Sequence, residues 1–260
     1  MPKFTIKDIP ESNLTNNELK NYYKERKKVI KSAYPNFNFT DLDLIFEIAC
    51  NNRDLFTAKN IDNNSKSWKS YINQWVTTYC SAVKNLPSKK MATKKSSCND
   101  PIVKTMIKVA QDIDDKKTLS QIGVHNLCMS AENVLGNLLE EFIAEKIRDY
   151  GWIWCAGNTL KSIDFCNKAG TILLQVKNKN NSENSSSNKI REGTTIKHWY
   201  RLSTSKKGGK ITPKFKWDKL NEIINSNLPK GKRAINLSEE SFQEYIINVV
   251  RSNPNIITKE

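Results

Sequence analysis

The sequence predicts an α/β protein in which a mostly helical N-terminal region precedes a core built on a β-sheet. Before residue 128, apolar residues recur at helical spacing in several separate segments. Three short β-rich segments follow Gly151, at 152–155, 161–166 and 171–177. A chain of 260 residues can bury one large core or two small ones. We therefore expect a helical region over residues 1–128 and a sheet-containing core over residues 129–260.

Three helices are expected in the N-terminal region, over 15–34, 41–50 and 67–86. Thr15 or Asn16 can cap the first, and Thr40 marks the start of the second. The aromatic residues of the third are more often core than platforms for stacked bases. Pro87 ends this helix, and residues 88–97 form a polar linker with four lysines. This linker either lies along a phosphate backbone or is a mobile surface loop.

Further helices and one late strand are expected beyond this linker. Helices are expected over 102–113, 118–127, from a cap at Ser130 to about 150, and over 194–201, 215–224 and 242–250. A strand is expected over 233–237, and residues 206–210 read as a basic turn. The long helix and the three β-rich segments after it give the order helix, strand, strand, strand.

The chain carries 42 basic and 27 acidic residues, a formal net charge of +15. Such an excess favours a polyanionic partner, and nucleic acid is favoured over a membrane surface because no amphipathic membrane helix or lipidation motif is evident. Solvated surface lysines are the competing explanation. With no apolar run suited to a signal peptide or a membrane span, we expect a cytoplasmic protein. The six cysteines contain no C-x-x-C pair, which favours free thiols over zinc or disulfides.

Three polar residues in the β-rich segments suggest a site that cleaves phosphodiesters. Asp164 lies in one segment, and Gln175 and Lys177 lie on one face of the next. A carboxylate suits Mg²⁺, which lowers the pKa of an attacking water, and an ammonium stabilises charge that develops on the phosphate. Gln175 can add only a neutral carbonyl oxygen or a hydrogen bond to a metal-bound water. Taken alone, such residues in a lysine-rich chain are more often a solvated strand end.

From Asp164 to Lys177 the sequence resembles the PD-(D/E)xK nuclease core of type II restriction endonucleases. Ile163 stands where that family often has Pro, and Gln175 replaces its second acid. The family often adds a Glu from an upstream helix, and residues 131–144 resemble that helix. The resemblance implies a central mixed β-sheet flanked by helices and a Mg²⁺-dependent deoxyribonuclease.

The same resemblance implies a catalytic set. Glu140 is the expected helix carboxylate, with Glu141 or Glu132 as alternatives. The implied catalytic residues are Glu140, Asp164, Gln175 and Lys177, of which the first three would hold or position the metal.

Directly after Lys177, residues 178–188 contain five Asn and four Ser. Asn, Ser and Arg side chains suit hydrogen bonds to base edges in a DNA groove. A low-complexity linker is the competing interpretation, although a tether seldom begins at the last residue of an active-site strand. The candidate DNA-binding residues are Lys179, Asn181, Ser182, Asn184, Ser186, Asn188, Lys189, Arg191, Lys197 and Arg201.

Over residues 130–202, and most clearly in 175–187 and 193–199, the sequence is similar to the SinI-type restriction endonucleases. This similarity implies a prokaryotic enzyme that recognises a short palindrome flanked by G/C pairs, such as GGWCC. It also implies a homodimer in which each protomer cuts one strand.

Other assignments stay open. A repair or junction nuclease with the same core would cut by DNA shape. A basic DNA-binding protein without activity is the other alternative, and Gln175 favours it. His198 and His125 are not selected as catalytic, because a lone histidine beside aromatic residues is usually packed or faces a phosphate.

Overall fold

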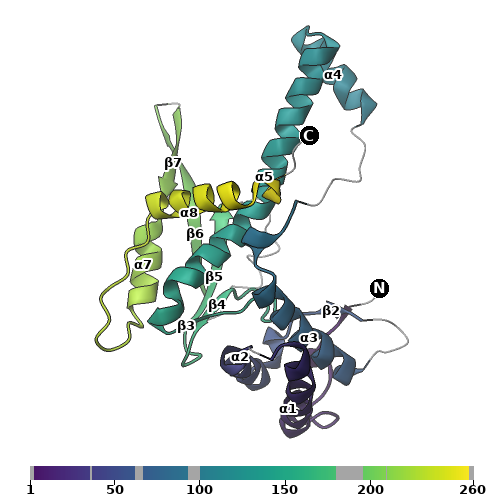
Figure 1. The fold of residues 1–260 in the computed structure, drawn as a ribbon, viewed down its shortest axis with the longest axis vertical. Helices are drawn as coiled ribbons and strands as arrows, with labels where there is room; N and C mark the ends of the chain where they lie inside the picture. Colours follow the sequence, from purple (N-terminus) through teal and green to yellow (C-terminus); the bar gives the residue numbers. More distant parts are fainter. Residues whose placement is uncertain are drawn as a thin grey trace. The chain divides into compact units, whose positions relative to one another are not determined.

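The structure is a computed structural model, and it describes residues 3–35, 37–61, 67–92, 100–179, 196–208 and 210–257. Its elements form two compact units. Unit 1 comprises Met1–Asn85 and Ile143–Ser238, and unit 2 comprises Leu86–Phe142 and Glu239–Glu260. The helices and the mixed β-sheet confirm the predicted α/β class (Figure 1). The predicted division at residue 128 falls inside a helix, and as a statement about domains it stays a prediction.

Unit 1 begins with the three predicted helices, α1 (Asn16–Ala33), α2 (Thr40–Asn51) and α3 (Trp68–Lys84). Thr15 caps α1 through a capping box with Glu18. Its hydroxyl accepts the Glu18 N–H at 3.2 Å, and Glu18 Oε2 accepts the Thr15 N–H at 2.7 Å. Ser67 caps α3 by accepting a backbone N–H from the first turn at 3.1 Å. The start of each of these two helices is therefore fixed by a local side chain.

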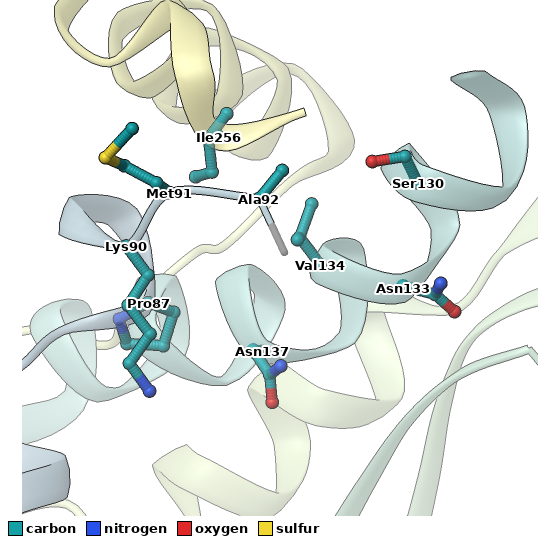
Figure 2. A pocket seen from close by; sticks show the side chains of 9 residues that line it. All are labelled: Pro87, Lys90, Met91, Ala92, Ser130, Asn133, Val134, Asn137 and Ile256. Atoms are coloured by element: carbon teal, nitrogen blue, oxygen red, sulfur yellow. The ribbon is translucent and has the colours of Figure 1, made fainter. Parts of the chain in front are cut away.

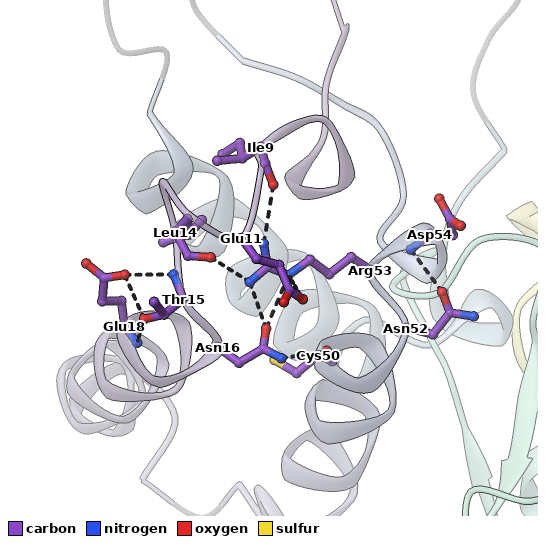
Figure 3. A network of polar contacts seen from close by, with 10 residues as sticks. All are labelled: Ile9, Glu11, Leu14, Thr15, Asn16, Glu18, Cys50, Asn52, Arg53 and Asp54. Carbon is purple, nitrogen blue, oxygen red and sulfur yellow. Dashed lines mark hydrogen bonds and ion pairs between the residues drawn. The ribbon is translucent and has the colours of Figure 1, made fainter.

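Arg53 fastens the segment that precedes α1 (Figure 3). It lies in the short 3₁₀ helix η2 (Arg53–Leu55) after α2. Its Nη2 donates to Leu14 O at 2.6 Å and to Asn16 Oδ1 at 2.8 Å, and its Nη1 donates to Ile9 O at 3.3 Å. One guanidinium with five donors thereby satisfies several acceptors of the N-terminal loop.

The three helices of unit 1 share an aromatic core. Tyr71, Trp75, Phe46 and Phe56 are all buried. Phe46 and Trp75 meet edge to face, with ring centroids 5.6 Å apart. Trp75 Nε1 donates to Thr159 O at 2.9 Å, which links this core to the loop between β3 and β4. The aromatic residues are core residues, as predicted.

The sheet of unit 1 has five strands among the described residues, in the order β3-β4-β5-β6-β7. They are β3 (Trp152–Trp154), β4 (Phe165–Asn167), β5 (Leu173–Lys179), β6 (Ile196–Lys207) and β7 (Lys210–Phe215). Neighbours are antiparallel except β5 and β6, which are parallel. The first three strands overlap the three predicted β-rich segments, although β4 begins only at Phe165, near the end of the predicted segment 161–166. A smaller sheet pairs β1 (Lys3–Phe4) with β2 (Lys59–Asn60).

The helix predicted over 194–201 is wrong, because its described part belongs to β6. Leu173 to Lys179 pair with Ile196 to Leu202 in a parallel register. This pairing supplies backbone partners that a local pattern does not reveal, so tertiary context decides the conformation. The predicted basic turn lies between β6 and β7, and β7 takes Phe215 from the predicted helix 215–224.

The strand predicted over 233–237 is also wrong. The helix before it, α7 (Trp217–Asn225), satisfies the backbone of this segment with side-chain amides. Asn225 exchanges two hydrogen bonds with the backbone of Ile235, at 3.0 and 2.9 Å. Asn221 does the same with Leu237, at 2.9 and 2.8 Å. The segment therefore stays irregular although its backbone groups are paired.

Unit 2 contains α4 (Pro101–Gln111), most of α5 (Asp115–Ile147) and α8 (Glu239–Ser252). The helices predicted over 118–127 and 130–150 are one helix, and Ser130 lies inside it instead of capping it. No proline interrupts this stretch, so the helical hydrogen bonds continue through it.

Short 3₁₀ helices in the two units are η1 (Ile6–Asp8), η4 (Pro87–Lys89), η5 (Arg148–Tyr150) and η6 (Pro254–Ile256). No helix in the described ranges is long and apolar enough to cross a membrane.

Candidate active site

Asp164 lies immediately before β4, where the chain enters the sheet. Ser162 has a φ of +60°, a left-handed conformation that turns the backbone just before the strand. The Asp164 N–H donates to Leu174 O at 2.9 Å, and the Asp164 C=O accepts the Cys155 N–H at 2.8 Å. The backbone of Asp164 is therefore held from both sides, by β5 and by the residue after β3.

The carboxylate of Asp164 reaches the backbone of β5. Its Oδ2 accepts the Val176 N–H at 2.7 Å. This bond resembles the ladder bond that a longer β4 would have made, with a side-chain oxygen in place of a backbone carbonyl. Because Val176 lies between Gln175 and Lys177, the bond sets the carboxylate beside both residues.

Gln175 and Lys177 share one face of β5. Both are half-buried, whereas Leu174 and Val176 between and beside them are buried. Phe165 is also buried and pairs with Leu174, so the half-buried Asp164, one residue earlier, falls on the same side as Gln175. The fold thus brings together the three sheet residues predicted for the site. Their catalytic roles stay predictions.

The side-chain oxygen of Gln175 lacks a partner in the described part of the chain. Its Oε1 is buried and accepts no hydrogen bond there. Leaving such a group unsatisfied costs about 1–3 kcal/mol, so the position suits a ligand that supplies positive charge or a hydrogen bond. Beside the Asp164 carboxylate, it fits a hard cation such as Mg²⁺, which takes oxygen ligands. Within the described residues, no three His, Cys, Asp or Glu side chains gather as a metal site, so further oxygen ligands would have to be added.

Strand β6 extends this face with two residues that the sequence analysis did not place in the site. In the parallel ladder, His198 pairs with Gln175 and Tyr200 pairs with Lys177. Both are half-buried, and registered residues of neighbouring strands share a face. No local sequence signal marks them, because their place beside Gln175 and Lys177 is set by the pairing of β6 with β5.

A pair of thiols lies behind the Asp164 backbone. Cys155 and Cys166 are buried, and their Sγ atoms are 3.7 Å apart. Burial, the contact with Cys166 and the nearby Asp164 raise the pKa of Cys155 well above its usual value. The five cysteines that the structure describes are free thiols, as predicted for those residues, and Cys98 lies outside the described part.

The helix carboxylates predicted for the site lie on α5 in unit 2. Glu141 is buried and is already engaged, because its Oε2 accepts the Ser88 N–H at 2.7 Å and its Oε1 accepts the Ser88 hydroxyl at 2.5 Å. Glu132 is exposed and Glu140 is half-buried. The hydrogen bonds of Glu141 indicate a structural role. The role of Glu140 as a metal ligand stays a prediction.

Three of the candidate DNA-binding residues lie in the described part of the chain. Lys179 and Lys197 are exposed on β5 and β6. Arg201 is only 8% exposed, its Nε donates to Asn178 Oδ1 at 2.9 Å, and its guanidinium lies 5.4 Å from the Phe215 ring centroid. The remaining candidates lie outside the described residues, namely Asn181, Ser182, Asn184, Ser186, Asn188, Lys189 and Arg191.

Unit 2 has an open pocket of about 280 Å³ (Figure 2). It is lined by Pro87, Lys90, Met91, Ala92, Ser130, Asn133, Val134, Asn137 and Ile256. The lining contains one ammonium and no carboxylate, so it lacks the metal ligand that phosphodiester hydrolysis needs. The chemistry of the chain is therefore better placed at Asp164 in unit 1.

Comparison with known proteins shows that the chain is similar to restriction endonucleases. A sequence model of the family described as SinI restriction endonuclease matches residues 73–251, which include all four predicted catalytic residues. The chain is 36% identical over 160 residues to the type II restriction enzyme Eco47I of Escherichia coli, a match of 60% of this chain and 64% of that enzyme. It is 34% identical over 166 residues to the type II restriction enzyme SinI of Salmonella infantis, covering 62% and 66%. The match thus spans just under two thirds of either relative.

Proposed function

The chain belongs to the SinI restriction endonuclease family, and on this premise we propose that it hydrolyses phosphodiester bonds in double-stranded DNA as a type II restriction endonuclease. One observation carries the assignment of the site. The Val176 N–H binds the Asp164 carboxylate at 2.7 Å, which sets a carboxylate beside Gln175 and Lys177. A carboxylate, a neutral oxygen and an ammonium on one face of the sheet are the groups that metal-assisted hydrolysis uses.

We assign Mg²⁺ as the cofactor, held by Asp164, Gln175 and Glu140. When bound, Mg²⁺ supplies charge for the scissile phosphate and lowers the pKa of a water ligand. Asp164 contributes the formal negative charge from the sheet. Gln175 contributes a neutral oxygen, so the sheet carries one carboxylate fewer than the family pattern, and Glu140 makes up part of this difference.

Lys177 serves the attacked phosphate. Its ammonium stabilises charge on the non-bridging oxygens or orients the attacking water. The water oxygen bonds to phosphorus as the bond to the leaving oxygen breaks, and no covalent bond forms to the protein. Positioning by the rigid strand supports this role, because Lys177 lies one residue beyond the Val176 N–H that binds Asp164.

The target we assign is a short palindrome of the GGWCC kind, bound by a homodimer. Each protomer would cut one strand, since a two-fold protein suits a two-fold site. The exposed Lys179 and Lys197, with the polar segment after β5, would contact the DNA. A net charge of +15 supports binding to a polyanion.

The test is cleavage of a fully sequenced plasmid with Mg²⁺, followed by mapping of the ends. Asp164→Ala and Lys177→Ala should abolish cutting while sparing binding in Ca²⁺. Lys168→Ala is the matched control, because Lys168 is an exposed lysine just after β4 and lies outside the site. Unchanged cleavage by the Asp164 or Lys177 variant would contradict the assignment.

Gln175 favours a second candidate, a DNA-binding protein of this family that does not cut. It predicts tight DNA binding with no mapped ends at any Mg²⁺ concentration. Cuts without a common sequence would instead indicate a structure-specific nuclease with the same core.

A further inference from the structure

Helix α4 presents an apolar stripe that no described residue covers. Ile102, Met106 and Val109 are 65%, 65% and 75% exposed. They are spaced four and three residues apart, so they lie on one side of the helix. A stripe of this spacing is the seam of helices that pack side by side. Among the described residues, no helix packs against the stripe of α4, since none of the residues of α4 is buried.

The N-terminal half of α5, which follows α4 after a short turn, has the same property. Val124 and Leu127 are 60% and 40% exposed and lie three residues apart. In contrast, the C-terminal half of α5 packs Leu138 against Val249 and Ile256. Val124 and Leu127 therefore have no covering element among the described residues.

The charges of α4 lie away from its apolar stripe. Its two charged residues, Lys104 and Lys108, are on the other side of the helix. Both reach Asp115, at 3.0 and 2.6 Å. The stripe is therefore free of charged residues of its own helix, which suits an apolar partner and does not suit a phosphate backbone.

The exposed area is close to what a stable dimer needs. The five residues of the two stripes are between 40% and 75% exposed. A fully exposed side chain of this size presents roughly 150 Å² to water, so together these five offer roughly 450 Å² per chain. Two copies would bury roughly 900 Å² in total, close to the lower bound of roughly 1,000 Å² for a specific interface.

We propose that the hairpin of α4 and the N-terminal half of α5 is the interface with a second copy of this chain. Two identical stripes can pair about a two-fold axis, because an isologous contact needs only a self-complementary surface. The four helices would then form a small bundle that buries the exposed stripes. The assignment rests on the proposed function for its homodimer, but its test needs no DNA.

The test is sedimentation velocity of the full chain without DNA, over about a thousandfold range of concentration. Met106→Glu places two carboxylates in the interface of each dimer and should raise the dimer dissociation constant at least about 100-fold. Val124→Glu should do the same from α5. Gln111→Glu is the matched control, since it adds the same charge to α4 opposite the stripe and keeps the acceptor that Gln121 uses at 2.7 Å.

Because Met106 is exposed within its own chain, its replacement should leave the circular dichroism spectrum unchanged. A wild-type chain that is monomeric at every concentration would overturn the proposal, and so would glutamate variants that dimerise like the wild type. The first result would mean that another part of the same chain covers the stripe. If the glutamate variants lose the dimer and the wild-type chain cuts no DNA, the proposed interface stands and the proposed nuclease function is refuted.

Discussion

Val176 donates its backbone N–H to the carboxylate of Asp164 at 2.7 Å, so one side chain serves both the sheet and the proposed metal site. The two duties need different properties. The hydrogen bond needs only an acceptor oxygen, whereas Mg²⁺ needs a formal negative charge. Substitutions that keep the oxygen and remove the charge can therefore separate folding from catalysis.

Asp164→Asn should keep the fold and lose the activity. The amide oxygen can still accept the Val176 N–H, so the free energy of unfolding should fall by less than about 1 kcal/mol. Cleavage should fall at least about 100-fold, because the site loses its charge for the cation. Urea unfolding and plasmid cleavage measure the two effects. A variant that cuts normally would remove Asp164 from the proposed metal shell.

Gln175→Glu should make the site more dependent on Mg²⁺. The new carboxylate lies beside Asp164, and two like charges in a half-buried site repel each other without a cation. We expect a lower melting temperature than the wild type in EDTA and a larger rise on addition of Mg²⁺, because a ligand that binds only the folded state stabilises it. Differential scanning fluorimetry with and without Mg²⁺ measures this. Equal responses of variant and wild type would place the cation elsewhere.

Alanine at Arg201 and alanine at Lys197 should have different effects, the first on stability and the second on DNA binding. Arg201 is buried and bonded to Asn178, so Arg201→Ala should lower the free energy of unfolding by about 2 kcal/mol. Lys197 is exposed, so Lys197→Ala should leave stability unchanged and weaken DNA binding, with a smaller dependence on salt. Chemical unfolding and DNA titrations at several salt concentrations test the pair. A salt-dependent loss of binding in a fully stable Arg201→Ala would show that Arg201 contacts phosphate directly.

Gly157→Ala should destabilise unit 1. Gly157 has a φ of +71°, and a Cβ there would lie 2.9 Å from the backbone oxygen of Thr78 in α3. The left-handed backbone and this contact both oppose a side chain, so we expect a loss of about 2 kcal/mol. Gly136→Ala on α5 is the control, since a Cβ there meets nothing within 4 Å and should stabilise the helix by about 1 kcal/mol. Melting temperatures that shift in the same direction for both variants would contradict this account.

Local sequence patterns predicted the elements that depend on local signals. Thr15, one of the two cap residues predicted for the first helix, caps α1 in the structure. Likewise, the alternation that placed Gln175 and Lys177 on one face is a property of a single strand. The conformation of these elements depends mainly on residues within the segment itself.

The misses are segments whose partners are distant in the chain. Strand β6 depends on β5, and the backbone of residues 233–237 depends on the side chains of Asn221 and Asn225. His198 was not selected because it is a lone histidine beside aromatic residues, and Tyr200 was not considered; their neighbours Gln175 and Lys177 are set by the register of that parallel pair. No window of local sequence contains this information.

The hydrogen bond from Trp75 Nε1 to Thr159 O has a genetic consequence. The turn that leads into Asp164 is anchored on α3, so substitutions that disturb this helix should also disturb the proposed catalytic site without contacting it. A screen for heat-sensitive alleles should therefore recover substitutions among the first eighty residues, and their carriers should cut DNA at low temperature only.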